Sequence, residues 1–475
     1  MTVVLMYPRI KKQVLSSWPP RGLVLLATVL KKYLDESIEI IDTSFEKDMD
    51  YAKRNLNRIK PKVFSVSVTP DFVDNAKKMI AHAKKLGSKV IIGGPYATIE
   101  PEKIFSDISG IDYIITGDMW DYYQALKSVL EDENSSDNIL DLKGIYYKKG
   151  KEILFTGEPS HDEDINTLPF PDYGLLPTAR DYFEFGTVTM MTSLGCPYNC
   201  SFCQPVLNRL FGKKIRFRSP SNVVEEIKTL RNNYDINEFY FIDDTFPLDL
   251  SWLEEFVSLL QENKLQDLRF IINTRANLVM EKAASLFKKM NCSLINIGVE
   301  SGSDKILKNL NKKITRKQII EAFDNCKKYG LKTNANFVMG NPGETKKTLK
   351  ETEKLIEQIK PEFLYMSFLT PYPGTRLYEE AEKAGTLNLY GNKEFNCRTY
   401  NKEELPLKNN NLIYQELIAF RKRVFRKRKP LLLWYFLKLI LKDLFRALKK
   451  GKILSYIKTQ RRRIKIYWKT KDYFG

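Results

Sequence analysis

Short apolar runs with strand character alternate with segments of helical spacing along the first 132 residues. Apolar residues at 22–34 and 72–86 recur at the spacing of one helix face. The strand-like runs lie at 3–7, 38–42, 63–69, 89–94 and 112–118. Strands that alternate with helices form a parallel sheet with helices on both faces. We therefore predict an α/β protein that begins with a Rossmann-like parallel sheet over residues 1–132.

A second alternation of strands and helices covers residues 186–400. Its predicted strands lie at 187–192, 238–243, 269–274, 294–299, 333–339 and 363–369. Each is followed by a loop and, in most cases, by a helical pattern. Six such units predict a partial (β/α)6 barrel, and functional residues of parallel barrels lie on loops at the carboxyl ends of the strands.

Two regions of different character flank this predicted barrel. Residues 133–185 are predicted to be a linker that contains a hairpin at 144–157, followed by a Pro-rich stretch at 168–177. Residues 401–475 are predicted to be a basic amphipathic helical tail.

The net charge of +19 is concentrated in this tail, because residues 411–475 hold 20 Lys/Arg and only 3 Asp/Glu. Four basic residues recur every four positions on one helix face: Lys438, Lys442, Arg446 and Lys450. Such a helix suits an anionic membrane surface. A helix docked on the barrel and a nucleic-acid-binding arm are the alternatives, and the large aliphatic content favours lipid over nucleic acid.

The sequence carries no signal for secretion or for a membrane span. The start "MTVVLMYPRI" has no basic segment followed by an apolar run and a cleavage site. Stretches of 18 uncharged apolar residues are also absent. We expect a cytoplasmic protein that lies on the inner face of the membrane through its tail.

Three of the six cysteines cluster in "LGCPYNCSFC", directly after a predicted strand. Thiolates are the usual ligands of iron–sulfur clusters, and Cys196, Cys200 and Cys203 would leave one iron of a 4Fe–4S cluster without a protein ligand. A structural zinc site would need a fourth ligand from a distant cysteine, because His82 and His161 are far from this loop. A chance grouping of buried cysteines is the other alternative.

The pattern C-x3-C-x-aromatic-C resembles the signature of the radical S-adenosylmethionine (SAM) superfamily. Five later segments resemble the successive strand-end motifs of those members that carry an N-terminal cobalamin-binding domain: "FIDDTF" (241–246), "INTRAN" (272–277), "IGVESGSDKIL" (297–307), "FVMGNPGET" (337–345) and "TPYPGTRLY" (370–378). The resemblance covers residues 1–400. It implies that SAM chelates the open iron and that one electron cleaves it to methionine and a 5′-deoxyadenosyl radical, which removes a hydrogen atom from a C–H bond.

Residues of these motifs are the candidates for SAM binding. Asp243 and Asp244 could accept hydrogen bonds from the SAM ammonium or from a substrate, and the Arg275 guanidinium fits the SAM carboxylate. The other candidates are Phe202 as a shield of the cluster, Glu300 and Ser301 near the ribose, and Gly340 and Gly343 where backbone approaches the adenosyl group. The alternative is that the acidic residues at strand ends cap the helices that follow.

The first domain resembles the cobalamin-binding domain of the same proteins in "PPRGL" (19–23), "SVSVT" (65–69) and "GGPYATIEPE" (93–102). The candidate cobalamin contacts are Ser65, Ser67, Gly93, Gly94 and Tyr96. The loop after the first strand, "YPRIKKQ", lacks the cobalt-ligating His of mutase domains, so cobalamin would bind without it. The alternative is an α/β domain kept for architecture or substrate contact.

The resemblance implies a 4Fe–4S cluster, SAM and cobalamin as cofactors, and a ferredoxin or flavodoxin as electron donor. The leading hypothesis is cobalamin-dependent methylation of an unactivated carbon, on a lipid or isoprenoid if the tail meets a membrane. An anaerobic cyclase or carbon–carbon coupling enzyme is the main alternative. RNA methylthiotransferases need three N-terminal cysteines that this chain lacks, and a non-catalytic electron carrier would not need the SAM motifs.

Overall fold

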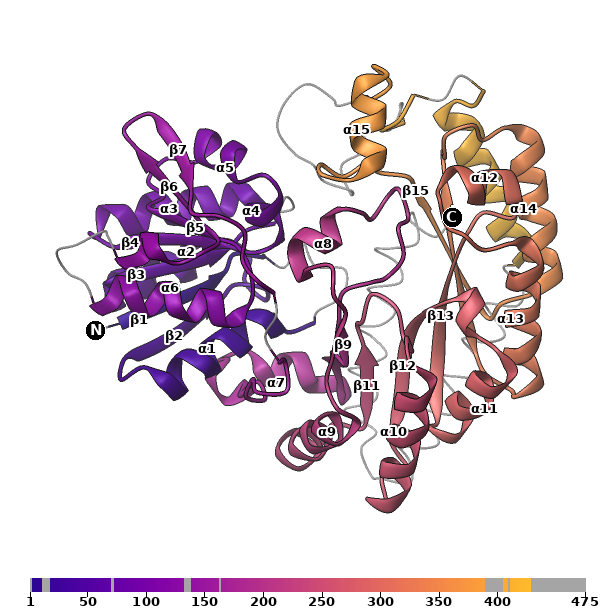
Figure 1. Ribbon diagram of the computed structural model, residues 1–475, viewed down its shortest axis with the longest axis horizontal. Coiled ribbons are helices and arrows are strands. Elements are labelled where there is room, and N and C mark those ends of the chain that lie inside the picture. The colour runs from indigo at the N-terminus through magenta and orange to yellow at the C-terminus, as the bar shows by residue number, and fades with distance from the viewer. Residues whose placement is uncertain are drawn as a thin grey trace.

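Two parallel sheets, one in each half of the chain, organise the structure, which is a computed structural model (Figure 1). It describes residues 2–10, 18–69, 72–131, 138–161, 164–388, 405–408 and 411–428. The indigo-to-purple part in Figure 1 holds the first sheet, and the pink-to-orange part holds the second. These are the two α/β units that the alternating pattern predicts.

The first sheet has seven strands in the order β2-β1-β3-β4-β5-β6-β7. Its strands are β1 (Thr2–Tyr7), β2 (Ser37–Asp42), β3 (Val63–Ser67), β4 (Lys89–Gly93), β5 (Tyr113–Ile115), β6 (Ile145–Lys149) and β7 (Glu152–Phe155). The first five strands are parallel, as expected. The predicted hairpin at 144–157 forms β6 and β7, but it pairs antiparallel to β5 and extends the sheet instead of belonging to a linker.

Helices cover both faces of this sheet because side chains alternate along each strand. The helices are α1 (Arg21–Tyr33), α2 (Asp50–Ile59), α3 (Val73–Lys85), α4 (Pro95–Ile99), α5 (Pro101–Asp107) and α6 (Met119–Glu131). Val3 and Leu5 share a core with α1 and α6. Val4 and Met6 point the other way, into a core with α2, α3 and α5. The sheet is therefore buried on both sides, and its carboxyl edge is where a ligand of such a fold binds.

The second sheet is the predicted partial barrel, with six parallel strands in the order β15-β14-β13-β12-β11-β8. These strands are β8 (Thr187–Met190), β11 (Glu238–Phe241), β12 (Arg269–Arg275), β13 (Cys292–Glu300), β14 (Thr333–Met339) and β15 (Phe363–Phe368). Two short strands, β9 (Ser193–Leu194) and β10 (Arg216–Phe217), pair with each other after β8.

Helices cover the outer face of the barrel strands (Figure 1). The helices of this half are α7 (Ala179–Tyr182), α8 (Val206–Phe211), α9 (Pro220–Tyr234), α10 (Leu250–Glu262), α11 (Glu281–Lys289), α12 (Asp304–Asn309), α13 (Arg316–Lys328), α14 (Lys346–Ile359) and α15 (Arg376–Lys383). Buried residues alternate with half-buried ones along β12, β13 and β14, so one face of each strand packs on helices and the other faces the lumen.

The first part of the basic tail, a helix over 414–428, docks on the barrel. Leu417 and Phe420 join the barrel core, while Arg423 and Lys427 form ion pairs with Glu353 of α14 at 3.1 and 2.8 Å. This helix is the yellow one beside α14 in Figure 1. The expected amphipathic face at 438–450 lies outside the described residues. In the described part of the chain, no helix is long and apolar enough to cross a membrane.

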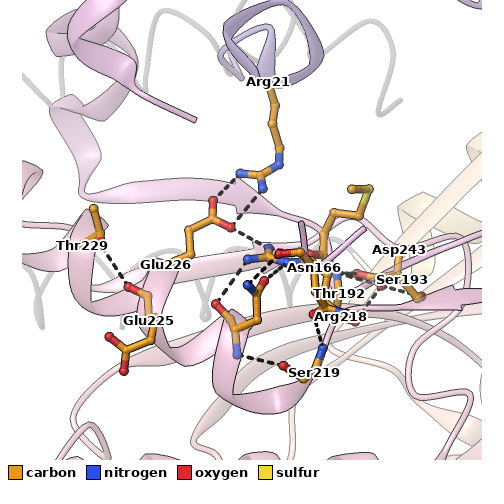
Figure 2. Close-up of polar contacts among 12 residues, drawn as sticks. Arg21, Asn166, Thr192, Ser193, Arg218, Ser219, Glu225, Glu226, Thr229 and Asp243 are labelled. Atoms are coloured by element: carbon orange, nitrogen blue, oxygen red, sulfur yellow. Dashed lines mark hydrogen bonds and ion pairs between the residues drawn. The ribbon is translucent and has the colours of Figure 1, made fainter. Parts of the chain in front are cut away.

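A buried ion triad joins the two halves (Figure 2). Glu226 of α9 is 1% exposed and accepts hydrogen bonds from Arg21 Nη1 of α1 at 2.6 Å and from Arg218 Nη1 at 2.5 Å. Burial alone would raise the pKa of Glu226, but the two guanidinium groups outweigh it and hold this pKa below its ordinary value. The stabilisation is therefore present above the unfolded pKa of about 4.3 and is lost as the pH falls through the folded pKa.

Replacement of Glu226 by Gln should destabilise the protein by about 3–5 kcal/mol, because two guanidinium groups would stay buried without a carboxylate. Chemical denaturation followed by circular dichroism measures this change. The matched control is Glu225→Gln on the same helix, whose carboxylate is exposed and pairs only with Lys228 at 2.7 Å. The control should change the stability by no more than about 0.5 kcal/mol. Equal effects of the two substitutions would contradict a role for the triad.

Candidate functional site

The cysteine loop follows β9 and is held at the carboxyl edge of the barrel by a buried aspartate. Asp243 Oδ1 accepts hydrogen bonds from the backbone N–H groups of Thr192 and Ser193 at 3.0 and 2.6 Å, and from both of their hydroxyl groups at 2.7 Å. Burial raises the pKa of Asp243 above its usual value. This carboxylate therefore fixes the strand that leads into the cysteine loop, and its role in SAM binding stays a prediction.

Backbone hydrogen bonds tie the loop to the elements around it. Ser201 N–H donates to the Leu310 carbonyl at 3.0 Å, and Leu377 N–H at the start of α15 donates to the Ser201 carbonyl at 2.9 Å. Phe202 packs on an apolar cluster that includes Leu369 and Leu377. Phe202 therefore anchors the loop, and its role as a shield of the cluster stays a prediction.

The three loop cysteines are free thiols with graded burial. Cys200 is 5% exposed, and Cys196 and Cys203 are half-buried. Burial and the nearby Cys200 raise the pKa of the Cys203 thiol to about 12, against the opposing charge of Lys312. Iron binding would therefore have to displace a firmly held proton.

Among the described residues, no three His, Cys, Asp or Glu side chains lie close enough together to hold one metal ion. Each cysteine of a cluster binds a different iron, so its thiolates lie farther apart than the ligands of a single ion. A cavity of about 500 Å³ opens beside the loop and is lined in part by Cys196, Tyr198, Lys213 and Arg376.

Arg275, at the end of β12, points at the cysteine loop. Its Nη1 donates to Cys200 Sγ at 3.3 Å, and its Nη2 donates to the carbonyl oxygen of Lys312. The guanidinium carbon also lies 3.7 Å from the ring centre of Tyr198. The guanidinium is therefore engaged with the loop and its surroundings, and its pairing with the SAM carboxylate stays a prediction.

The candidates Glu300 and Ser301 lie at the end of β13 and directly after it. Glu300 accepts a hydrogen bond from Lys312 Nζ at 2.6 Å and has a φ of +63°, a conformation that costs energy for a residue other than glycine. Ser301 is fully buried, and its hydroxyl accepts from Ser303 N–H at 3.2 Å and lies 3.4 Å from Thr352 Oγ1. Ser301 therefore supports the loop before α12 and does not face the lumen.

Gly340 and Gly343 shape the turn after β14. Their φ angles of +81° and +75° are ones that glycine adopts without strain. Gly340 N–H donates to Glu344 Oε2 at 2.6 Å, and burial raises the pKa of Glu344 to about 7. The α-carbon of Gly340 faces Leu417 of the C-terminal helix, which leaves the predicted contact with an adenosyl group without structural support.

Asp244 is the candidate whose carboxylate stays open to the lumen. It follows Ile242 on the same side of the strand, and both residues are exposed. Partial burial and the adjacent Asp243 raise the pKa of Asp244 to about 6. Asp244 is therefore the remaining acidic group for a cationic ligand.

The expected cobalamin contacts gather at the carboxyl edge of the first sheet. Ser67 and Gly93 are paired neighbours on β3 and β4, and a Cβ on Gly94 would lie 2.7 Å from Ser67 Oγ. A Cβ on Gly93 would lie 2.3 Å from the ring of Tyr122, whose hydroxyl is 2.9 Å from Ser65 Oγ. The small residues therefore form a cradle on this edge, and the Tyr122 ring lies in it.

This edge faces the cysteine loop across the domain boundary. Tyr96 is half-buried in α4, and α4 lies against α8, which directly follows the loop (Figure 1). Asp118, after β5, pairs through both oxygens with Arg216 of β10 and lies 3.5 Å from His161 Nδ1. The carboxyl ends of both sheets thus meet at one interface.

Comparison with known proteins agrees with this arrangement. Residues 190–356 match the Radical SAM superfamily, and residues 10–127 match the B12 binding domain. An uncharacterized methyltransferase of Pyrococcus horikoshii is 32% identical over 381 residues, which are 78% of this chain and 80% of that protein. The chain belongs to the radical SAM superfamily. It is a radical SAM enzyme with an N-terminal B12-binding domain.

Other relatives share this organisation. An anaerobic magnesium-protoporphyrin IX monomethyl ester cyclase of Cereibacter sphaeroides is 26% identical over 80% of this chain and 63% of its own length. The structure of TsrM, a radical SAM methyltransferase of Kitasatospora setae with cobalamin and a 4Fe–4S cluster bound, has a TM-score of 0.69 at 21% identity. It covers 82% of this chain and 79% of its own, and it supports the fold.

The residues of this radical SAM enzyme fit the cofactors of the two domains. Three thiols on one loop suit a 4Fe–4S cluster, and Ser65, Ser67, Gly93 and Gly94 form a cradle of small residues into which the Tyr122 ring projects. Tyr122 would have to turn aside for a group that enters this cradle.

Two functional neighbours were missed by sequence reasoning. Lys312 follows α12 in a turn, and Tyr122 lies within a helix. Neither position carries a local signal. Tyr198, inside the cysteine motif, is the sequence feature that could have indicated a cation stacked on an aromatic ring.

Arg275→Gln should lower the midpoint potential of the reconstituted cluster, because a positive charge beside Cys200 favours the more negative, reduced form. Loss of about 1 kcal/mol of this stabilisation corresponds to roughly 40 mV for a one-electron couple. A redox titration followed by electron paramagnetic resonance measures the shift. Arg269→Gln, at the opposite end of β12, is the control and should leave the potential unchanged. An unshifted potential in Arg275→Gln with a full cluster would contradict this role.

SAM affinity should fall as the pH is lowered through about 6, because protonation of Asp244 removes the charge that attracts the SAM ammonium. Equilibrium binding of SAM to the anaerobically reconstituted enzyme, measured on both sides of that pH, tests this. Asp244→Asn should bind SAM weakly and lose the dependence, whereas the exposed Asp267→Asn should keep it. A wild-type profile that is flat through this range would rule out Asp244 as the SAM contact.

Proposed function

We propose that the protein is a cobalamin-dependent radical SAM methyltransferase that methylates an unactivated carbon. The observation that carries this proposal is the meeting of the two carboxyl edges, the cradle of the B12-binding domain and the cysteine loop of the barrel, through α4 and α8. A relative named as a methyltransferase over most of both chains supports it. Methyl transfer requires these cofactors to share one substrate, and this geometry would allow it.

The residues of the chain have separate tasks in this proposal. Cys196, Cys200 and Cys203 hold the cluster, and Arg275 balances its charge. Asp244 orients the SAM ammonium. When bound, the cluster, SAM and cobalamin supply the radical and the methyl group, and the protein positions them and excludes water.

A reductant and a membrane surface are the proposed partners. A ferredoxin or flavodoxin type of donor carries acidic surfaces, and Lys213 and Arg376 beside the cysteine loop would suit one. A membrane role rests on the sequence of residues 429–475 alone, because the tail helix over 414–428 is bound to the barrel.

A radical SAM cyclase is the second candidate. The similarity to the cyclase of Cereibacter sphaeroides over 80% of this chain favours it. The two candidates differ in whether a methyl group leaves SAM and appears in the product.

The test is cofactor and product analysis of protein purified and reconstituted without oxygen, with cobalamin supplied. We expect about four irons and one cobalt per chain, and transfer of label from methyl-labelled SAM into an extracted substrate pool. Cys200→Ala should lose iron and SAM cleavage, whereas Cys326→Ala, in the core away from the loop, should keep both. Iron and SAM cleavage without cobalt or transferred label would overturn methyl transfer and favour the cyclase.

A further inference from the structure

A continuous ladder of asparagine side chains crosses the inside of the barrel. Asn273, Asn296 and Asn334 occupy paired positions on β12, β13 and β14. Asn296 Nδ2 donates to Asn273 Oδ1 at 3.1 Å, and Asn334 Nδ2 donates to Asn296 Oδ1 at 3.0 Å. Asn336 Oδ1 accepts from Asn334 Nδ2 at 3.2 Å, and the Tyr240 hydroxyl donates to Asn273 Oδ1 at 2.9 Å.

These side chains face the lumen and not the helices. Their neighbours along the strands, such as Ile272, Ile295 and Ala335, are fully buried in the core. Successive side chains of a strand point to opposite faces, so the asparagines point inward. All four are half-buried, as expected for the wall of an open space.

The ladder leaves hydrogen-bonding groups unused. A carboxamide offers two N–H donors and an oxygen with two lone pairs. In the described part of the chain, the Nδ2 groups of Asn273 and Asn336 and the Oδ1 of Asn334 have no partner. A free acceptor on Asn334 and a free donor on Asn336 thus lie side by side on one strand. Such groups need a partner when water is excluded.

The surroundings of the ladder are apolar on one side and charged on the other, where Arg275 is the paired neighbour of Gly298 and the Glu300–Lys312 ion pair lies close to it. Ile271 and Leu294 lie on one side of it and Gly298 on the other. Tyr365 on the edge strand β15 and Ile242 directly after β11 flank it, and they are 51% and 42% exposed. Large apolar side chains with this much exposure inside a barrel are surfaces that a ligand can cover.

The charged groups near the ladder are already in use. Arg275 is engaged with Cys200 and the Lys312 carbonyl, and Glu300 is paired with Lys312. An anionic group placed on the ladder would lose its water and would have to share Arg275, which has no carboxylate partner of its own, with the anionic thiolates of the cluster, which is costly. Asp244, at the rim, would repel it further.

We propose that the asparagine ladder is the substrate-binding wall of the barrel and that it selects an uncharged molecule. This molecule has an apolar body that covers Ile242 and Tyr365, and a neutral group with an adjacent donor and acceptor, an amide or two neighbouring hydroxyls. The inference rests on the proposed function in placing a substrate here. It adds the class of substrate and the residues that recognise it.

The position of the ladder suits this role. On β12 it lies two residues before Arg275, so a molecule bound to it lies next to the cysteine loop. Trp18, from the first domain, contacts the Tyr240 ring at 5.7 Å between ring centres. The first domain therefore contacts a residue that is hydrogen-bonded to the ladder.

The test uses three small probes of similar size and ligand-observed NMR on the reconstituted full chain. N-Cyclohexylacetamide carries an amide, cis-1,2-cyclohexanediol carries two hydroxyls, and cyclohexylacetate carries a charge. We expect the amide or the diol to bind and the carboxylate to bind at least about tenfold more weakly. The stronger of the two neutral probes identifies the group that the site prefers. Binding of the carboxylate as tight as the neutral probes, or binding of none, would overturn the proposal.

Substitutions on the ladder test whether the probe binds there. Asn336→Leu should lower the affinity for the neutral probe about tenfold, which is the effect of one lost hydrogen bond in a closed site. Asn233→Leu, the same change on an exposed position of α9, should have no effect. Asn336→Asp keeps the size of the side chain and removes its donor, so it should also lower the affinity for the neutral probe. This variant provides the test if Asn336→Leu does not fold. Unchanged affinity in folded Asn336 variants would contradict the proposal.

These measurements separate this inference from methyl transfer. Probe binding needs no turnover, whereas the label from SAM reports on the reaction alone. Neutral probes that bind through Asn336 in an enzyme that transfers no methyl group would leave the ladder as the substrate wall of another radical SAM reaction.

Discussion

The burial of one carboxylate between two guanidinium groups is the interaction on which the relation of the two domains depends. Glu226 meets Arg21 of the first domain and Arg218 of the barrel in a buried place. In such a place a lone charge is far more costly than in solution, so the three groups hold one arrangement. Arg218 Nη1 also donates to the carbonyl of Met191 at 3.0 Å, just before the strand that leads to the cysteine loop. The triad therefore connects the first helix of the B12-binding domain with the base of the cluster loop.

The cluster loop is likewise held by buried polar groups that pair with one another. Asp243 satisfies two backbone N–H groups and two hydroxyls, and Arg275 satisfies a thiol and a carbonyl. Buried polar atoms that are fully paired fix a loop more firmly than apolar contacts do, because each has a directional partner. The two adjacent aspartates therefore have different roles. Asp243 fixes the strand that leads into the cysteine loop, and Asp244 remains open to the lumen.

The asparagine ladder beneath this charged rim is neutral. The carboxamides of the ladder hold one another across three strands and still present donors and an acceptor inward. A radical reaction needs a substrate held rigidly beside the cofactors and away from water. A neutral wall with fixed hydrogen-bonding groups can supply this without bringing a second set of charges near the cluster.

The sequence by itself determined the strands, the helices and the cysteine loop, because hydrophobic periodicity and motif spacing are local properties of the chain. All six barrel strands and the first five strands of the N-terminal sheet lie where the apolar runs predict them. Only the tertiary structure decided the partners of Asp243, Arg275 and Glu226, which lie 51, 75 and 205 residues away along the chain. It also decided that the hairpin joins the first sheet and that the asparagines form one ladder, because pairing across strands exists only after the strands have come together.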